Sequence, residues 1–169
     1  VDIITIPSLH AEMGLKALGA GKHLLIEKPI DISIEKAMHL VNECKKLNLM
    51  LSVISQYRYR FSINSLYSYI RNQRLGDILY GNIDVNLSTS ELYYKNSPWR
   101  EDKLLSGGGV LITNAIHYID IIQWLLGDIK SVFGKIYTLK HDIKVEDTAL
   151  AIINFKHNAS ITLTVSNTL

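Results

Sequence analysis

The first third of the chain alternates apolar strands with amphipathic helices, and this alternation constrains the fold more than any other feature. The opening run VDIITI (residues 1–6) is β-branched and apolar, which is typical of a strand buried on both faces of a parallel sheet. We expect a helix at 8–20 capped by Ser8, a strand at 22–26, a helix at 34–47 and a strand at 49–54. Strands and helices in this order predict a parallel, doubly wound α/β sheet with right-handed crossovers.

The pattern changes near Gln56, which divides the chain into two part-domains, residues 1–56 and 57–169. A helix at 62–73 and a strand at 78–87 are followed by a polar loop at 88–106, and three glycines then open a long helix that ends at Gly127. Three further strands are expected at 131–139, 148–155 and 160–165. Strands in succession without intervening helices predict an antiparallel or mixed sheet.

The two ends of the sequence predict that the chain is a fragment. A strand buried on both faces needs neighbours on both sides, and nothing precedes Val1. At the other end the chain stops four residues after the last expected strand. We therefore expect the first part of the parallel sheet to be missing and the second domain to be truncated.

Composition narrows the class of protein. Apolar residues make up 47% of the chain and charged residues 20%, so wholesale disorder is excluded. A net charge of +2 disfavours a dedicated nucleic-acid binder, and no membrane partner is expected because no apolar run approaches the length of a membrane span. Cys44 is the only cysteine, which excludes an intramolecular disulfide and predicts a reduced thiol in a cytoplasmic protein.

Lys28 is the first candidate for chemistry. Ligands bind beyond the carboxyl ends of parallel strands, where residues 7–10 and the Glu27-Lys28-Pro29 turn are expected. A lysine there can transfer protons if burial or a neighbouring cation lowers its pKa. The alternative is an ordinary solvated lysine.

A second candidate set lies on the long helix. Helical spacing places Thr113, His117, Asp120 and Trp124 on one face, and an aspartate one turn from a histidine can orient it as an acid or base. The three preceding glycines lower the stability of the fold. They are explained if a ligand approaches the backbone closely, or if the free amides of the helix start face a polar group. The alternative is that this face of the helix is simply exposed to solvent, with His117 and Asp120 as surface polar residues.

Several other classes of site are absent from the sequence. Gly19 and Gly21 lack the third glycine of the dinucleotide fingerprint, and the three glycines before the long helix lack the lysine of a P-loop. No metal site is expected because His117 and His141 have no ligand partners at metal-binding spacing. The nucleophile elbow of the α/β-hydrolases is also missing.

Five segments together resemble the glucose–fructose oxidoreductase / inositol dehydrogenase (Gfo/Idh/MocA) superfamily. They are VDIITIPSLHAEMGLKALGAGKHLLIEKP, SQYRYRFS, SPWRED, SGGGVLITNAIHYIDIIQWLLG and VEDTALAIINF. The resemblance implies an α/β fold, with the C-terminal part of a Rossmann-type sheet followed by an α+β domain with an open, mainly antiparallel sheet. It also implies oxidation or reduction of a sugar, nucleotide-sugar or cyclitol carbon with NAD or NADP, and a homo-oligomer.

The resemblance assigns roles by position. Lys28 would hydrogen-bond the reacting hydroxyl beside the nicotinamide, and His117 would be the acid/base. The implied cofactor-binding residues are Thr5, Ile6, Pro7, Ser8, His10, Glu27, Lys28, Gln56, Trp99 and Arg100. The implied substrate-binding residues are Thr113, Asn114 and Asp120, the last either touching substrate or orienting His117.

Two departures from the family pattern matter. Many members have aspartate four residues before the histidine, where this chain has Thr113, and the surrounding run looks closest to nucleotide-sugar 3-dehydrogenases. The glycine-rich turn that binds the pyrophosphate is absent, so we expect the chain alone to bind NAD(P) poorly and to turn over little. Two alternatives remain: a non-catalytic binding or assembly protein on this fold, and an NAD-dependent glycosidase of the same superfamily.

Overall fold

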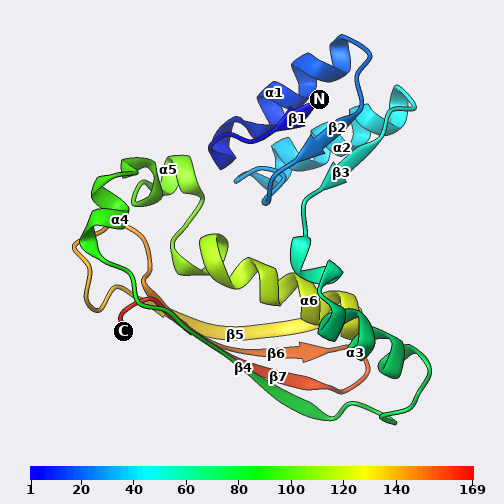
Figure 1. Ribbon diagram of the computed structural model, residues 1–169, viewed down its shortest axis with the longest axis vertical. Coiled ribbons are helices and arrows are strands. Elements are labelled where there is room, and N and C mark those ends of the chain that lie inside the picture. Colours follow the sequence, from blue (N-terminus) through cyan, green and yellow to red (C-terminus); the bar gives the residue numbers. More distant parts are fainter.

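The computed structural model describes residues 1–169 and shows two separate sheets, one from each half of the chain (Figure 1). The first sheet is fully parallel in the order β1-β2-β3, as the alternating pattern predicted. Its strands are β1 (Asp2–Ile3), β2 (Leu24–Ile26) and β3 (Leu51–Val53), and the helices between them are α1 (His10–Gly19) and α2 (Ile34–Lys46). The side chain of Ser33 caps α2 by accepting a hydrogen bond from the amide of Lys36.

Two local expectations in this half were wrong. The first strand is two residues long, and within the predicted run Val1 and Ile4 are exposed while Ile3 is buried. The reason is that β1 forms the edge of the described sheet and pairs only with β2. Ser8 does not cap a helix, because it lies inside a short 3₁₀ turn (Pro7–Leu9) and its hydroxyl has no partner.

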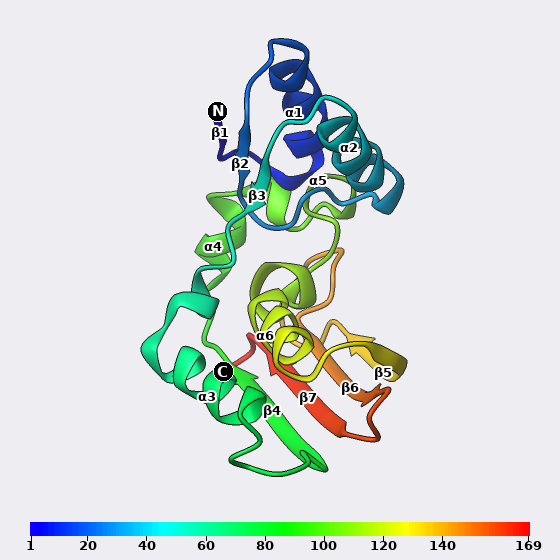
Figure 2. The same cartoon turned by 90° about the vertical axis from the view of Figure 1, so that its right-hand side faces the viewer.

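The second sheet is mixed, in the order β4-β7-β6-β5, with β4 parallel to β7 and the other two pairings antiparallel. Helices lie against one face of it and the other face is open (Figures 1 and 2). Phe133, Leu150 and Ile152 are exposed apolar residues of β5 and β6. The elements are α3 (Phe61–Arg71), β4 (Tyr80–Asn86), β5 (Ile129–Tyr137), β6 (Thr148–Phe155) and β7 (Ser160–Ser166).

The segment expected to be a polar loop at 88–106 is largely helical, so that prediction was wrong. It contains α4 (Glu91–Lys95), a 3₁₀ turn (Pro98–Arg100) and α5 (Lys103–Ser106). Each piece is too short to show a full helical period in the sequence. Asp102 begins α5 by accepting a hydrogen bond from the amide of Leu104.

The long helix consists of a π-helical turn (Leu111–Ala115) that runs into α6 (Ile116–Leu126). Its apolar residues, among them Ile122, pack on the second sheet in a core with Phe155 and Leu163. The helical stretch Lys103–Leu126 is long and apolar enough to span a membrane by composition, contrary to the sequence expectation. It is also a core helix against the sheet, and positive φ angles interrupt it at Gly107 and Gly108.

Packing against Glu146 explains the third glycine. A Cβ atom on Gly109 would lie 1.8 Å from the carbonyl oxygen of Glu146, so the two backbones meet where no side chain fits. That carbonyl accepts a hydrogen bond from Val110, and the Glu146 carboxylate accepts one from the amide of Leu111. The sequence offered two explanations for the glycines, a closely approaching ligand or a polar group facing the free amides of the helix start. The second one fits, because Glu146 supplies that polar group.

Replacing Gly109 with alanine tests this contact. We expect Gly109→Ala to lower the free energy of unfolding by about 3 kcal/mol or more, because the added methyl overlaps backbone atoms that cannot move aside. Urea denaturation gives the measurement. Gly19→Ala is the matched control, since a Cβ there meets nothing within 4 Å, and equal denaturation midpoints for both variants would contradict the prediction.

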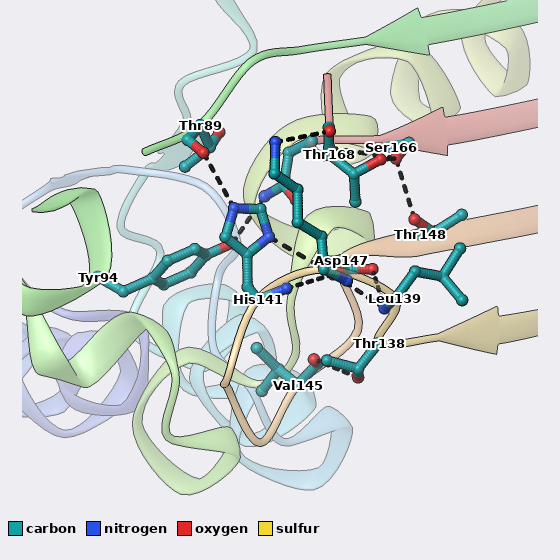
Figure 3. Close-up of polar contacts among 12 residues, drawn as sticks. Thr89, Tyr94, Thr138, Leu139, His141, Val145, Asp147, Thr148, Ser166 and Thr168 are labelled. Atoms are coloured by element: carbon teal, nitrogen blue, oxygen red, sulfur yellow. Dashed lines mark hydrogen bonds and ion pairs between the residues drawn. The ribbon is translucent and has the colours of Figure 1, made fainter. Parts of the chain in front are cut away.

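A buried carboxylate organises the turn between β5 and β6 (Figure 3). Asp147 is 0% exposed and accepts hydrogen bonds from the backbone amides of Leu139, Lys140 and His141. Burial alone would raise the pKa of Asp147, but these amides outweigh it and the pKa lies below its ordinary value. The imidazole of His141 lies beside this carboxylate, and its Nε2 donates to the carbonyl of Thr89.

We expect Asp147→Asn to destabilise the fold at neutral pH by about 2–4 kcal/mol, because charge-assisted hydrogen bonds are lost in a buried site. A depressed folded-state pKa contributes stability above the unfolded pKa and loses it as pH falls through the folded pKa. The stability gap between wild type and variant should therefore narrow as the solution is acidified. Denaturation across pH checks this, with exposed Asp142→Asn as control; a gap that stays constant into acid would contradict the role.

Candidate active site

Lys28 and His117 line the same cleft, which has a volume of about 570 Å³. The cleft lies between the first sheet and α6, at the place where Figure 2 shows the two halves of the chain facing each other. Lys28 follows β2, and His117 lies in the first turn of α6. Two residues chosen from opposite halves of the sequence are thus brought to one site.

The side chain of Lys28 crosses this cleft. Its Nζ donates a 2.8 Å hydrogen bond to the carbonyl of Thr113, which lies in the π-helical turn. Its own amide donates to the carboxylate of Glu27. Burial lowers the pKa of Lys28, Glu27 opposes that effect and Arg100 adds to it. The ammonium is therefore fixed in position and loses its proton more readily than a free lysine.

His117 is held by an aromatic neighbour that the sequence interpretation did not assign. The ring of Tyr57 stacks on the imidazole with a centroid distance of 4.5 Å and an interplanar angle of 18°. Burial, followed by the charge of Lys28, lowers the pKa of His117. A lowered pKa leaves the imidazole neutral at pH 7 and able to accept a proton.

Asp120 is engaged by Arg58. The Nε of Arg58 donates to one carboxylate oxygen at 2.7 Å and the terminal nitrogen donates to the other, so the pair is bidentate. Arg58 comes from a 3₁₀ turn (Gln56–Tyr59) just before α3. The sequence interpretation left Arg58 unassigned, although it lies in the SQYRYRFS segment that carried the family resemblance.

Thr113 meets Lys28 through its backbone carbonyl. Its hydroxyl lies 2.8 Å from the carbonyl of Gly109 and 2.8 Å from the side-chain oxygen of Asn114, while its carbonyl receives Lys28. The π-helical turn also changes the regular spacing that we assumed between Thr113 and His117. The substrate-binding roles of Thr113, Asn114 and Asp120 stay predictions.

The residues expected to bind the cofactor fall into two groups. Around the first loop, Thr5 and Gln56 are exposed and Pro7 is buried. His10 is 1% exposed, and its two ring nitrogens lie within hydrogen-bond distance of the carbonyls of Pro29 and Thr5. His10 therefore ties the first loop to the turn that carries Lys28, and its ring nitrogens are not free for a ligand. Ile6, Ser8 and Glu27 are partly buried in the same region.

The second group is a cluster of one cation, Arg100, with aromatic rings that include Trp99. The guanidinium of Arg100 lies over the rings of Trp99 and Tyr93, 4.4 and 4.5 Å from their centroids. It donates to the Tyr93 hydroxyl, and its Nε is buried without a partner. Because the Arg100 charge lowers the pKa of Lys28, this cluster acts on the same site.

Comparison with known proteins places both halves of the chain in one family. Residues 1–55 match the family described as "Oxidoreductase family, NAD-binding Rossmann fold", and residues 63–169 match the "GFO/IDH/MocA C-terminal domain". The glucose-6-phosphate 3-dehydrogenase of Bacillus subtilis is 37% identical over 73% of this chain, and the levoglucosan dehydrogenase of Pseudarthrobacter phenanthrenivorans is 33% identical over 78%. This chain spans 35% and 34% of the length of those two relatives.

A solved structure agrees with these matches. The WlbA dehydrogenase of Bordetella pertussis, in complex with NADH and UDP-GlcNAcA, superimposes with a TM-score of 0.96 at 27% identity. The match covers 99% of this chain and 48% of that one. The fold and the family predicted from the sequence are confirmed. The chain belongs to the GFO/IDH/MocA family of NAD-binding oxidoreductases.

Proposed function

We propose that this chain carries the hydride-transfer site of an NAD(P)-dependent dehydrogenase or reductase acting on a hydroxyl-bearing carbon of a sugar or nucleotide sugar. The observation that carries the proposal is the meeting of Lys28 and His117 in one cleft, with the lysine fixed by the Thr113 carbonyl. The names of the relatives support this substrate class, since they include a glucose-6-phosphate 3-dehydrogenase and a structure bound to UDP-GlcNAcA. The name of that dehydrogenase favours the carbon-3 hydroxyl as the reacting group.

The two side chains suit the proton chemistry of such a reaction. As hydride leaves a carbinol carbon, its hydroxyl oxygen gives up a proton and becomes a carbonyl oxygen. His117, with its lowered pKa, accepts that proton. The ammonium of Lys28 donates a hydrogen bond to the same oxygen and stabilises the negative charge that develops on it. In the reductive direction His117 returns the proton.

Residues around the Lys28 turn fit a nicotinamide dinucleotide. The first loop and the Glu27-Lys28-Pro29 turn follow β1 and β2, at the sheet edge where dinucleotides bind. Arg100 offers a buried Nε without a partner next to the Trp99 ring, which suits a polar, aromatic ligand. When bound, the nicotinamide supplies the hydride acceptor or donor.

Two expectations about the whole protein stay predictions. A cytoplasmic location is supported by the buried, unpaired thiol of Cys44. Assembly as a homo-oligomer is supported by the exposed apolar residues Phe133, Leu150 and Ile152 on the uncovered face of the second sheet.

Lys28→Met in the complete protein tests the proposed site. We expect loss of hydride transfer by a factor of about 10² to 10⁴, because the reacting oxygen loses its charged donor. The measurement is NADH absorbance during turnover of a sugar or nucleotide-sugar substrate. Lys22→Met is the control, since Lys22 is exposed in the same half of the chain. Unchanged turnover in Lys28→Met would remove Lys28 from the reaction, and sugar cleavage without net NADH would favour the glycosidase alternative.

The pH dependence of sugar oxidation should follow the two lowered pKa values. Below the pKa of His117, which lies below its ordinary value, the base is protonated and the rate falls. Above the pKa of Lys28, which is also lowered, the ammonium is lost and the rate falls again. A plot of kcat/KM against pH should show both limbs, and His117→Gln should remove the acid limb together with most of the rate. An acid limb that persists in that variant would contradict the assignment.

A further inference from the structure

Asp120 lies one helical turn beyond His117, in a position from which a carboxylate acts on an imidazole. Its charge raises the pKa of His117, although burial and Lys28 outweigh it. A free carboxylate in this place would also accept a hydrogen bond from the imidazolium and favour the charged form. The partner that binds Asp120 therefore influences the pKa of His117.

We infer that Arg58 is a positioning residue: its guanidinium holds both oxygens of Asp120 and keeps the carboxylate from pairing with His117, to which Asp120 makes no hydrogen bond. The inference rests on the proposed function only where it concerns turnover, because the contacts belong to the folded chain itself. Arg58 lines the same cleft as Lys28 and His117, and its guanidinium is paired with Asp120 there. It acts on the base through Asp120.

Arg58 is held rigidly enough for this task. The Asn64 side-chain amide donates a 2.6 Å hydrogen bond to the Arg58 carbonyl, which fixes its backbone at the start of α3. Its guanidinium lies over the ring of Trp124, 5.4 Å from the centroid, and Trp124 in turn stacks on Tyr67 at 4.1 Å. A planar, bidentate fork against a carboxylate is a geometry that lysine does not reproduce.

Two carboxylates raise the pKa of His117, Glu27 more strongly than Asp120, and Asp120 is the one held by a cation through both of its oxygens. From the turn after β2, Lys28 lowers the pKa of His117 and Glu27 raises it, and Glu27 already accepts a hydrogen bond from the Lys28 amide. Arg60, at the end of the 3₁₀ turn, adds a further lowering effect. Within α6, Tyr118 lies next to His117 in sequence and its own pKa is raised by burial.

Tyr57 completes the surroundings with its stacked, uncharged ring. Arg58 itself has a pKa raised by its hydrogen bond to Asp120, so it stays charged throughout the range in which histidine titrates. The state of Asp120 is thus governed by a partner that does not titrate.

The experiment is an NMR titration of the His117 ring C–H signals in the complete protein, without substrate or cofactor. The variants are Arg58→Met, Asp120→Asn and the double variant, with Arg58→Lys as the conservative change. With Asp120 set free, Arg58→Met should move the His117 midpoint to higher pH by about one pH unit. Asp120→Asn alone should move the midpoint to lower pH, because the carboxylate charge that raises the pKa is removed, and the double variant, which lacks both charges, should lie near the wild-type value.

If the shifts of the His117 midpoint are not additive in the double variant, the two positions are coupled. General loosening of the fold would not produce this coupling. Arg58→Lys should give an intermediate midpoint, because the charge is restored without the bidentate fork. An unchanged midpoint in Arg58→Met, or an equal upward shift in the double variant, would overturn the inference. The outcome is independent of the proposed reaction: the shift can occur in a protein that never transfers hydride, and its absence would leave Lys28 and His117 in place.

Discussion

The hydrogen bond from the Lys28 ammonium to the Thr113 carbonyl is the contact on which the candidate site depends. It joins residues 85 positions apart and links the parallel sheet to the helix of the mixed sheet. A main-chain carbonyl receives the lysine because it lies in a π-helical turn, a departure from α-helical geometry that is frequent at functional sites. An ammonium held by a neutral acceptor stays positively charged toward the cleft, whereas a carboxylate partner would cancel that charge.

The glycines fix the position of this turn through close contacts with neighbouring residues. Gly109 meets the backbone of Glu146, and the amides of Val110 and Leu111 both end on that residue, so the helix starts at one place on the second sheet. Gly107 meets Ile32 of the first half in the same way, with its absent Cβ 2.8 Å from an Ile32 methyl. Gly107 therefore allows the two halves to approach each other, and Gly109 allows the helix to start against Glu146 within the second half.

Sequence reasoning identified the features that are local or periodic. The alternation of strands and helices predicted the parallel sheet, and the strand expected at 148–155 coincides with β6. The short helices between 88 and 106 were missed because they hold too few residues for a period to appear. Lys28 and His117 could be named because the family motifs mark them.

The contacts that tune those two residues could not be named, since tertiary packing decides them. Arg58 and Asp120 are 62 positions apart, and the sequence shows several arginines that could have served as well. Once the pair is formed, each charge around His117 has a defined partner: Asp120 is bound by Arg58, and Glu27 accepts from the Lys28 amide. Burial of the imidazole and the positive charge of Lys28 then outweigh the two carboxylates, so a second proton on the ring is disfavoured. The same positive charge attracts a substrate oxygen that is becoming negative. One distribution of charge therefore keeps His117 unprotonated and also stabilises the oxygen from which His117 takes the proton.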